Sequence, residues 1–269
     1  MAVNDGRSWS FNDDGTDNNA QVGAGGIDGG RDRQTVYQES STQNFPLGAR
    51  RSFPDGRSFR YAEFGAAVNA GLIVSQDISA TCLAETNDIV IAASGAFSPA
   101  ADSTKLQITL ASITADDYAG GYLHITDDAG EGYQYRIQSN SATGATTSGT
   151  VDIYLYDPIV TALTAGATDI AITGNLWNGV IGAVAASDSI MSGVTARTMQ
   201  SGYFGWVQTT GVATILADGT IAIRDNLTLS DGVTGAVQLK DAEVEPLVGF
   251  ALFAPDDTGH VGVRLYGLE

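Results

Sequence analysis

Two histidines are the side chains of this sequence best suited to proton transfer. His124 lies in the run YLHIT, and His260 follows the turn DDTG. Either could act as a general base if a nucleophile and an orienting carboxylate converged on it. The sequence has no phosphate-binding Gly-Lys-Ser/Thr loop, no serine flanked by glycines at both second neighbours and no His-Glu-x-x-His pair. We therefore interpret both histidines as ordinary hydrogen-bonded residues and predict no enzyme activity and no catalytic residue.

Acidic side chains gather at four places where they could bind calcium or serve glycoside hydrolysis. None of the four has the alternating ligands and terminal glutamate of a calcium loop, and Asp readily accepts backbone hydrogen bonds in tight turns. We interpret them as turns. Two histidines and the single Cys82 make no cluster typical of a transition-metal site, so we predict no metal and no cofactor. The four clusters are Asp13, Asp14 and Asp17; Asp116 and Asp117; Asp127, Asp128 and Glu131; and Asp256 and Asp257.

The segment 45–64, FPLGARRSFPDGRSFRYAEF, is the densest group of residues suited to binding another protein. Arginine pairs with carboxylates in a fork and stacks on aromatic rings, so both residue types are common at the centres of interfaces. The same alternation also fits a first strand of the folded body, reached through a tight turn at Pro54–Gly56. Both interpretations stay open. The candidate contact residues are Arg50, Arg51, Phe53, Arg57, Phe59 and Arg60.

Residues 1–44 are rich in Gly, Asp, Asn, Ser and Gln and contain few large apolar side chains. Such a segment cannot bury enough apolar surface to offset the entropy lost on ordering it. We predict an extended N-terminal arm that is disordered alone and can become ordered on a neighbour's surface. Trp9, Phe11 and Tyr37 are the exceptions, spaced widely like anchors for pockets elsewhere.

The rest of the sequence consists of short alternating runs between turn residues. Apolar side chains occupy alternate positions in 105–113, as on a half-buried strand. The runs 122–126 and 133–138 flank the turn DDAGEG and predict a hairpin. Further strands are predicted at 151–156, 169–173, 203–209, 219–223 and 261–265.

Many short strands separated by Gly, Asp and Asn, with few helix-favouring residues, predict an all-β fold. We expect a β-sandwich or barrel body with the long extended N-terminal arm and very little helix. The spacing of strands and turns restarts near 158–166, which indicates two β domains, 45–160 and 161–269. Each is long enough to bury a core, and the two could also pack as one body.

The basic residues are distributed unevenly along an acidic chain. Seven of the 13 basic side chains, all Arg, lie in the first sixty residues, although the formal net charge of the whole chain is −18. Such a charge repels DNA and anionic bilayers. No run approaches the roughly 18 apolar residues that span a membrane. We therefore expect neither nucleic acid nor a membrane as a partner, and we expect the arginine-rich part to contact the partner.

Segments spread over roughly 45–269 carry a resemblance to a known group of proteins. They are LGAR at 47–50, PDGRSFRYA at 54–62, AGLI at 70–73, DYAGGYL at 117–123, GEGYQYRI at 130–137, LYDP at 155–158, GYFGWVQTTG at 202–211 and VGVRL at 261–265. These segments resemble virion structural proteins of tailed bacteriophages. Within that group, the chain looks like a capsid decoration, or cement, protein.

The resemblance implies a structural role on the outer surface of the capsid, where decoration proteins clamp neighbouring major capsid subunits. The implied partners are the major capsid protein and further copies of the same chain, with a trimer favoured over a dimer. An alternative is a tail-associated or receptor-binding virion protein that recognises host-surface glycan through exposed aromatics such as Tyr154, Tyr156 and Trp206. A glycan-degrading enzyme that uses paired Asp residues is a third hypothesis.

Overall fold

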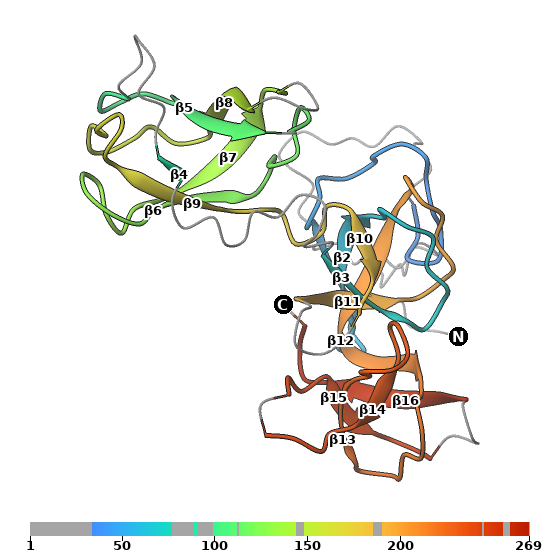
Figure 1. Cartoon of the computed structure of the whole chain (residues 1–269). Helices are drawn as coiled ribbons and strands as arrows, with labels where there is room; N and C mark the ends of the chain where they lie inside the picture. The colour runs from blue at the N-terminus through green and yellow to red at the C-terminus, as the bar shows by residue number, and fades with distance from the viewer. Residues whose placement is uncertain are drawn as a thin grey trace, which may run out of the picture. The chain divides into compact units, whose positions relative to one another are not determined.

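The computed structural model describes residues 34–76, 89–90, 99–111, 113–143, 148–184, 190–243, 245–254 and 259–268. Within these ranges the chain is all-β, because every regular element is a strand and no helix occurs. The strands form two antiparallel sheets (Figure 1). The chain divides into two compact units: unit 1 comprises Met1–Gln76 and Trp177–Glu269, and unit 2 comprises Asp77–Leu176.

Unit 1 holds a ten-stranded sheet to which both ends of the chain contribute. The strand order is β10-β3-β11-β12-β16-β15-β13-β14, with β2 paired to β12 and β1 paired to β2. The strands are β1 (Arg50–Ser52), β2 (Ser58–Glu63), β3 (Ile73–Gln76), β10 (Val180–Gly182), β11 (Met191–Thr195), β12 (Phe204–Leu216), β13 (Asn226–Leu229), β14 (Val237–Leu239), β15 (Gly249–Ala251) and β16 (His260–Leu265).

Strand β12 belongs to both halves of this sheet: one half contains β1, β2, β3, β10 and β11, and the other contains β13, β14, β15 and β16. Its first part pairs with β11 and β2, with Trp206 opposite Tyr61, and its second part pairs with β16, starting at Gly211. Gly211 has a φ of +88°, a conformation that glycine adopts far more readily than other residues. A Cβ atom at this position would lie 2.9 Å from the Cα atom of Arg57. Glycine therefore allows β12 to change partners beside the start of β2.

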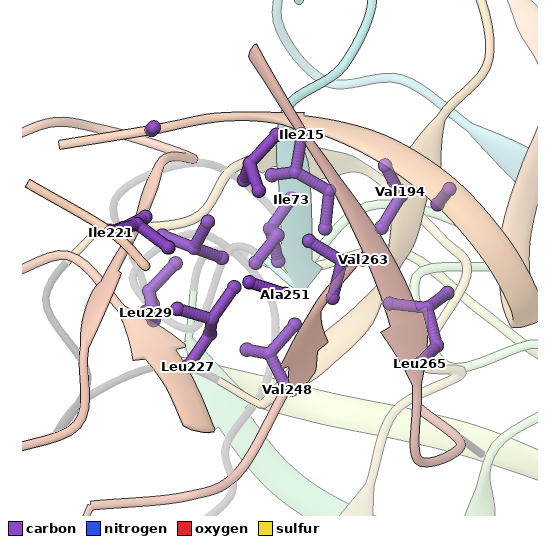
Figure 2. Packing of buried hydrophobic residues seen from close by; sticks show 14 of the residues in the cluster. Ile73, Val194, Ile215, Ile221, Leu227, Leu229, Val248, Ala251, Val263 and Leu265 are labelled. Atoms are coloured by element: carbon purple, nitrogen blue, oxygen red, sulfur yellow. The ribbon is translucent and has the colours of Figure 1, made fainter. Parts of the chain in front are cut away.

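The largest buried cluster of unit 1 lies in the half of the sheet that contains β13 to β16. Its side chains come from β3, β11 and β12 as well as from the C-terminal strands. Figure 2 shows Ile73, Ile215, Leu227 and Val263 meeting in this cluster. All four side chains are fully buried, so strands far apart in the sequence share one apolar core.

Two smaller clusters cover β2 and β12. One contains Phe59, Tyr61 and Trp206, and the other contains Ala62 and Val207. Because successive side chains of a strand point to opposite faces, the two clusters lie on opposite faces of this strand pair. The β2–β12 pair is thus enclosed on both sides, which explains why its sequence lacks a simple alternation of apolar and polar residues.

Unit 2 holds a six-stranded sheet with the order β4-β9-β6-β7-β8-β5. Inward side chains such as Leu123, Ile137 and Ile153 belong to one buried cluster. The opposite face of the sheet carries mostly polar and tyrosine side chains, as expected for an antiparallel sheet packed on one side only. The strands are β4 (Ile89–Val90), β5 (Lys105–Ala111), β6 (Tyr122–Ile125), β7 (Gln134–Asn140), β8 (Ser148–Leu155) and β9 (Asp169–Thr173).

The predicted all-β class is confirmed for the described residues, and so is the hairpin, which is formed by β6 and β7. The strand predicted at 219–223 is wrong. A local turn replaces it, because the carboxylate of Asp225 accepts a hydrogen bond from the amide of Ala222 at 2.7 Å. Ile221 is nevertheless buried, so the apolar signal there reflects packing and not strand pairing.

The units differ from the two predicted domains. The expected boundary after residue 160 falls inside unit 2, because β9 pairs with β6. The segment 45–76 belongs to unit 1, because β2 pairs with β12 and β3 pairs with β10 and β11. Unit 2 is an insertion between β3 and β10, and these two strands are themselves neighbours, with Gln76 opposite Val180.

The structure also differs from the predicted arm at 34–44, which packs onto unit 1. Gln34 and Val36 are both 4% exposed. The amide nitrogen of Gln34 donates to the carbonyl oxygen of Phe204 at 2.7 Å, and its amide oxygen accepts from the Tyr61 hydroxyl at 2.7 Å. These hydrogen bonds and the burial of Val36 offset the entropy lost on ordering the segment.

Candidate functional site

The candidate contact residues of 45–64 lie mainly in a hairpin formed by β1 and β2. Arg51 is opposite Phe59, and Arg50 is opposite Arg60. Because side chains alternate between the two faces of a strand, the first pair points to one face and the second pair to the other. The hairpin therefore divides the candidate residues into two groups.

Arg51 lies inside an aromatic cluster. Its guanidinium carbon is 4.3 Å from the ring centroid of Trp206 and 5.5 Å from that of Phe45. Its Nη1 atom donates to the carbonyl oxygen of Gln34 at 2.9 Å, and the residue is 4% exposed. Arginine is weakly hydrated and stacks well on rings, which makes this burial tolerable. The prediction that Arg51 contacts a partner is wrong, because the side chain holds unit 1 together.

Phe59, Phe53 and Arg60 are also used within the fold. Phe59 is fully buried, and Phe53 packs edge-on against it with ring centroids 5.4 Å apart. The guanidinium of Arg60 lies 5.1 Å from the ring centroid of Trp177 and donates to the carbonyl oxygen of Gly48 at 2.9 Å. The prediction of a partner contact is therefore wrong for Phe59. The alternative interpretation of this segment, a strand of the folded body, is confirmed.

Tyr37, Arg57 and Arg197 form a surface group that we call the Tyr37 cluster. Tyr37 is 58% exposed, and its hydroxyl accepts a hydrogen bond from Nη1 of Arg57 at 3.3 Å. Its carbonyl oxygen accepts from Nη1 of Arg197 at 3.2 Å. Arg57 forms an ion pair with Asp55 at 2.7 Å. Arg197 forms one with Glu39 at 2.9 Å, so one ion-paired arginine bonds the hydroxyl of Tyr37 and another bonds its backbone.

The Tyr37 cluster borders a cleft of about 360 Å³ in unit 1. Val194 and Ala213 supply apolar lining, whereas Thr195, Gln208 and His260 supply polar groups. Pockets that accept anchor side chains or small molecules have this mixture of apolar walls and a few polar groups. The cleft and the neighbouring Tyr37 cluster are the candidate site of unit 1.

The ion pair at the rim of this site lowers the pKa of Asp55. Burial alone would raise this pKa, but hydrogen bonds from the backbone amide and the guanidinium of Arg57 outweigh burial and hold it below its ordinary value of 3.8. Since the pKa is lowered in the folded state, the stabilisation is present above pH 3.8 and is lost as the pH falls through the lowered value. The pair is therefore intact at neutral pH.

The described residues do not assemble a metal-binding group. No three His, Cys, Asp or Glu side chains lie together in a way that could hold a metal ion in the part of the chain that the structure describes. Asp116 and Asp128 have positive φ angles of 66° and 62°, which confirms the interpretation of their clusters as turns. The clusters at 13–17 and 256–257 lie outside the described residues.

His124 and His260 lie in different units. The Nε2 atom of His124 forms a hydrogen bond with the hydroxyl of Thr173 at 2.8 Å, which is the ordinary role that the sequence indicates. His260 lines the cleft of unit 1.

No described segment forms a helix with the length and apolar character that crossing a membrane requires.

The aromatic residues considered for glycan binding separate into exposed and buried ones. Tyr154 and Tyr156 are 38% and 54% exposed and lie in or directly after β8 in unit 2. Trp206 is 3% exposed and packs on Tyr61 with ring centroids 5.1 Å apart. The prediction that Trp206 is an exposed aromatic is therefore wrong. Tyr154 and Tyr156 stay candidates for glycan binding.

The anchors predicted in the arm have different outcomes. Trp9 and Phe11 lie outside the described residues. Tyr37 does not insert into a pocket of its own chain but stays exposed at the rim of the cleft. Sequence reasoning missed Arg197 and Glu39, which pair although 158 positions separate them. A pairing over such a distance leaves no local signal in a single sequence.

The chain matches no protein family, and comparisons with curated proteins and with solved structures likewise find no match.

Proposed function

We propose that this chain is a structural protein of a tailed-bacteriophage virion that binds the outer surface of the capsid and stabilises contacts between major capsid subunits. The resemblance of segments between 45 and 269 to such proteins supports the proposal. Those segments include parts of β2, β6, β7, β12 and β16, which build both sheets. The likeness therefore concerns the framework of the fold and not a single exposed loop.

The Tyr37 cluster is the observation that carries this proposal. Tyrosine and arginine are the residue types most often found at the energetic centres of protein interfaces. Here the ring of Tyr37 is exposed, while Arg57 donates a hydrogen bond to its hydroxyl and Arg197 donates one to its backbone carbonyl oxygen. A preordered anchor loses little side-chain entropy on binding. We expect a side chain of the capsid protein to enter the cleft beside it.

This arrangement revises the expected contact. Of the arginines expected to face the capsid, Arg51 is buried and Arg60 lies against Trp177, whereas Arg50 is exposed and Arg57 is half-buried in its ion pair with Asp55. Charge alone therefore contributes less to capsid binding than the sequence indicates, and the exposed ring of Tyr37 contributes more. We propose that the chain acts as a homo-oligomer, with a trimer favoured, because several modest contacts joined in one assembly bind far more tightly than one.

The proposal is tested on purified virions of the phage that encodes the chain. We expect its copy number on a protein gel to be close to that of the major capsid protein. In a low-resolution map of the particle, we expect density for this protein on the head. Tyr37→Ala should lower occupancy of the head, whereas Tyr266→Ala, at another exposed tyrosine of unit 1, should not. A copy number far below that of the major capsid protein, or density on the tail, would overturn the proposal.

The second candidate is a tail-associated or receptor-binding virion protein that recognises host-surface glycan. The exposure of Tyr154 and Tyr156 favours it, because large aromatic rings are usually buried when they serve only the fold. The same gel separates the two candidates, since a tail protein is present in far fewer copies than a decoration protein.

A further inference from the structure

Tyr122, Tyr154 and Tyr156 define an exposed surface of unit 2 that we call the tyrosine face. Tyr122 on β6 lies opposite Arg136 on β7, and the amide of Tyr156 donates to the carbonyl oxygen of Arg136 at 3.0 Å. Tyr122 is 42% exposed and Tyr156 is 54% exposed. Because neighbouring strands lie about 4.8 Å apart, the chain positions that carry these two rings are roughly 10 Å apart.

Cations hold two of the three rings in place. The guanidinium carbon of Arg136 lies 5.1 Å from the ring centroid of Tyr156. The Nζ atom of Lys105 lies 5.5 Å from the ring centroid of Tyr154 and forms an ion pair with Asp152 at 2.8 Å. Rings that are held in this way lose little freedom when a ligand stacks on them.

Hydrogen-bonding groups surround the rings. Asp152 accepts a hydrogen bond from the amide of Gln107 at 2.7 Å, and His124 and Gln134 also occupy outward positions. Among the outward side chains of β5 to β9 that the structure describes, Ala171 is the only aliphatic one. The apolar surface of this face therefore consists almost wholly of tyrosine rings.

The charge around the face restricts the kind of ligand. The sequence of unit 2 contains twelve acidic side chains but only two basic ones, Lys105 and Arg136. Both basic residues lie on the tyrosine face, in contact with its rings. The net negative charge of the unit repels a polyanion at long range, whereas an uncharged ligand meets no such repulsion.

We propose that the tyrosine face binds an uncharged glycan. A sugar ring has an apolar face that stacks on tyrosine and hydroxyl groups at its rim, for which Asp152 and Gln107 are suitable partners. The inference does not rest on the position of the protein in the virion, since it applies on the head as well as on the tail.

The test uses the full chain and a printed array that carries uncharged hexose oligomers beside sialylated and uronate-containing ones. We expect retention on uncharged oligomers, and the best of these is then titrated into purified variants. Tyr156→Ala should weaken binding about tenfold, whereas Tyr156→Phe should keep it, because stacking needs the ring and not the hydroxyl. Tyr266→Ala, with an equally exposed ring in unit 1, is the matched control and should bind as the unchanged protein does.

Three binding results would each overturn the inference: no binding to any uncharged oligomer, a preference for the acidic ones, or equal affinity in Tyr156→Ala. A change in oligomeric state on Tyr156→Ala, measured by sedimentation, would instead identify the face as an interface between copies and would also overturn it. Unfolding by urea checks that the variants stay folded. The copy number in virions is a separate measurement, so failure here leaves the proposed decoration function standing.

Discussion

Arg51 shows how a single side chain can join two segments of unit 1. It contacts the rings of Phe45 and Trp206 and donates to the backbone of Gln34, so the segment 34–44 depends on it. An exposed arginine would add little to stability, but this one is desolvated and charged. Its loss would also leave the carbonyl oxygen of Gln34 without that donor in a buried place.

Arg51→Ala is expected to lower the free energy of unfolding by about 2–4 kcal/mol, because a hydrogen bond from a charged group and two cation–π contacts are lost. Arg50→Ala, next to it but exposed, is the matched control and should cost about 0.5 kcal/mol or less. Urea unfolding monitored by tryptophan fluorescence measures both. Equal effects of the two substitutions would contradict the interior role of Arg51.

Single residues were the least predictable feature of the site. The run Phe45 to Phe64 fits both a partner contact and a strand, and what decides between them is the position of Trp206, far along the sequence. The sequence around Gln34 gives no sign that this residue is buried, since its partners Tyr61 and Phe204 lie far along the chain in β2 and β12. Contacts of this kind depend on tertiary structure, which a single sequence does not reveal.

At the scale of the elements, β12 connects the two halves of the unit 1 sheet through Gly211. The strand predicted at 203–209 ended too early, because a glycine after a polar run resembles a strand end. Alternation was reliable in unit 2, where the sheet has one buried and one exposed face. It was less informative for β2, which is enclosed on both faces.

Gly211→Ala should destabilise unit 1 more than Gly219→Ala does. Both glycines have positive φ angles, +88° and +85°, so each substitution costs about 1–2 kcal/mol of backbone strain. Only at Gly211 would the new Cβ also contact backbone, 2.9 Å from the Cα atom of Arg57, and we expect about 1–3 kcal/mol more. Urea midpoints of the two variants test this. Indistinguishable midpoints would mean that β12 tolerates a side chain at the change of partner.

At the scale of the whole molecule, each unit has its own buried core. The cluster around Ile137 belongs entirely to unit 2, and the cluster around Ile215 belongs entirely to unit 1. Two cores with no shared members favour two separate unfolding transitions. The sequence predicted two β domains that could also pack as one body, whereas the composition of the two units depends on pairings between distant strands.

Ile137→Ala and Ile215→Ala should each shift a different transition, by about 2–5 kcal/mol. The sequence of unit 2 contains no tryptophan, whereas Trp177 and Trp206 lie in unit 1, so tryptophan fluorescence does not follow unit 2. Ile137→Ala is expected to leave the fluorescence transition unchanged and to move a second transition seen by circular dichroism. Ile215→Ala should move the fluorescence transition. A single transition that both substitutions shift equally would contradict two independent cores.

The pairing of β3 with β10 has a consequence for engineering. These strands form a hairpin in which the connection is a complete unit of about one hundred residues, with Gln76 opposite Val180 at the point of departure and return. A hairpin of this kind can be closed by a short turn, because its two strands already lie side by side. The same position can accept a foreign domain with closely spaced termini. Unit 1 can thus display a foreign domain that is inserted between β3 and β10.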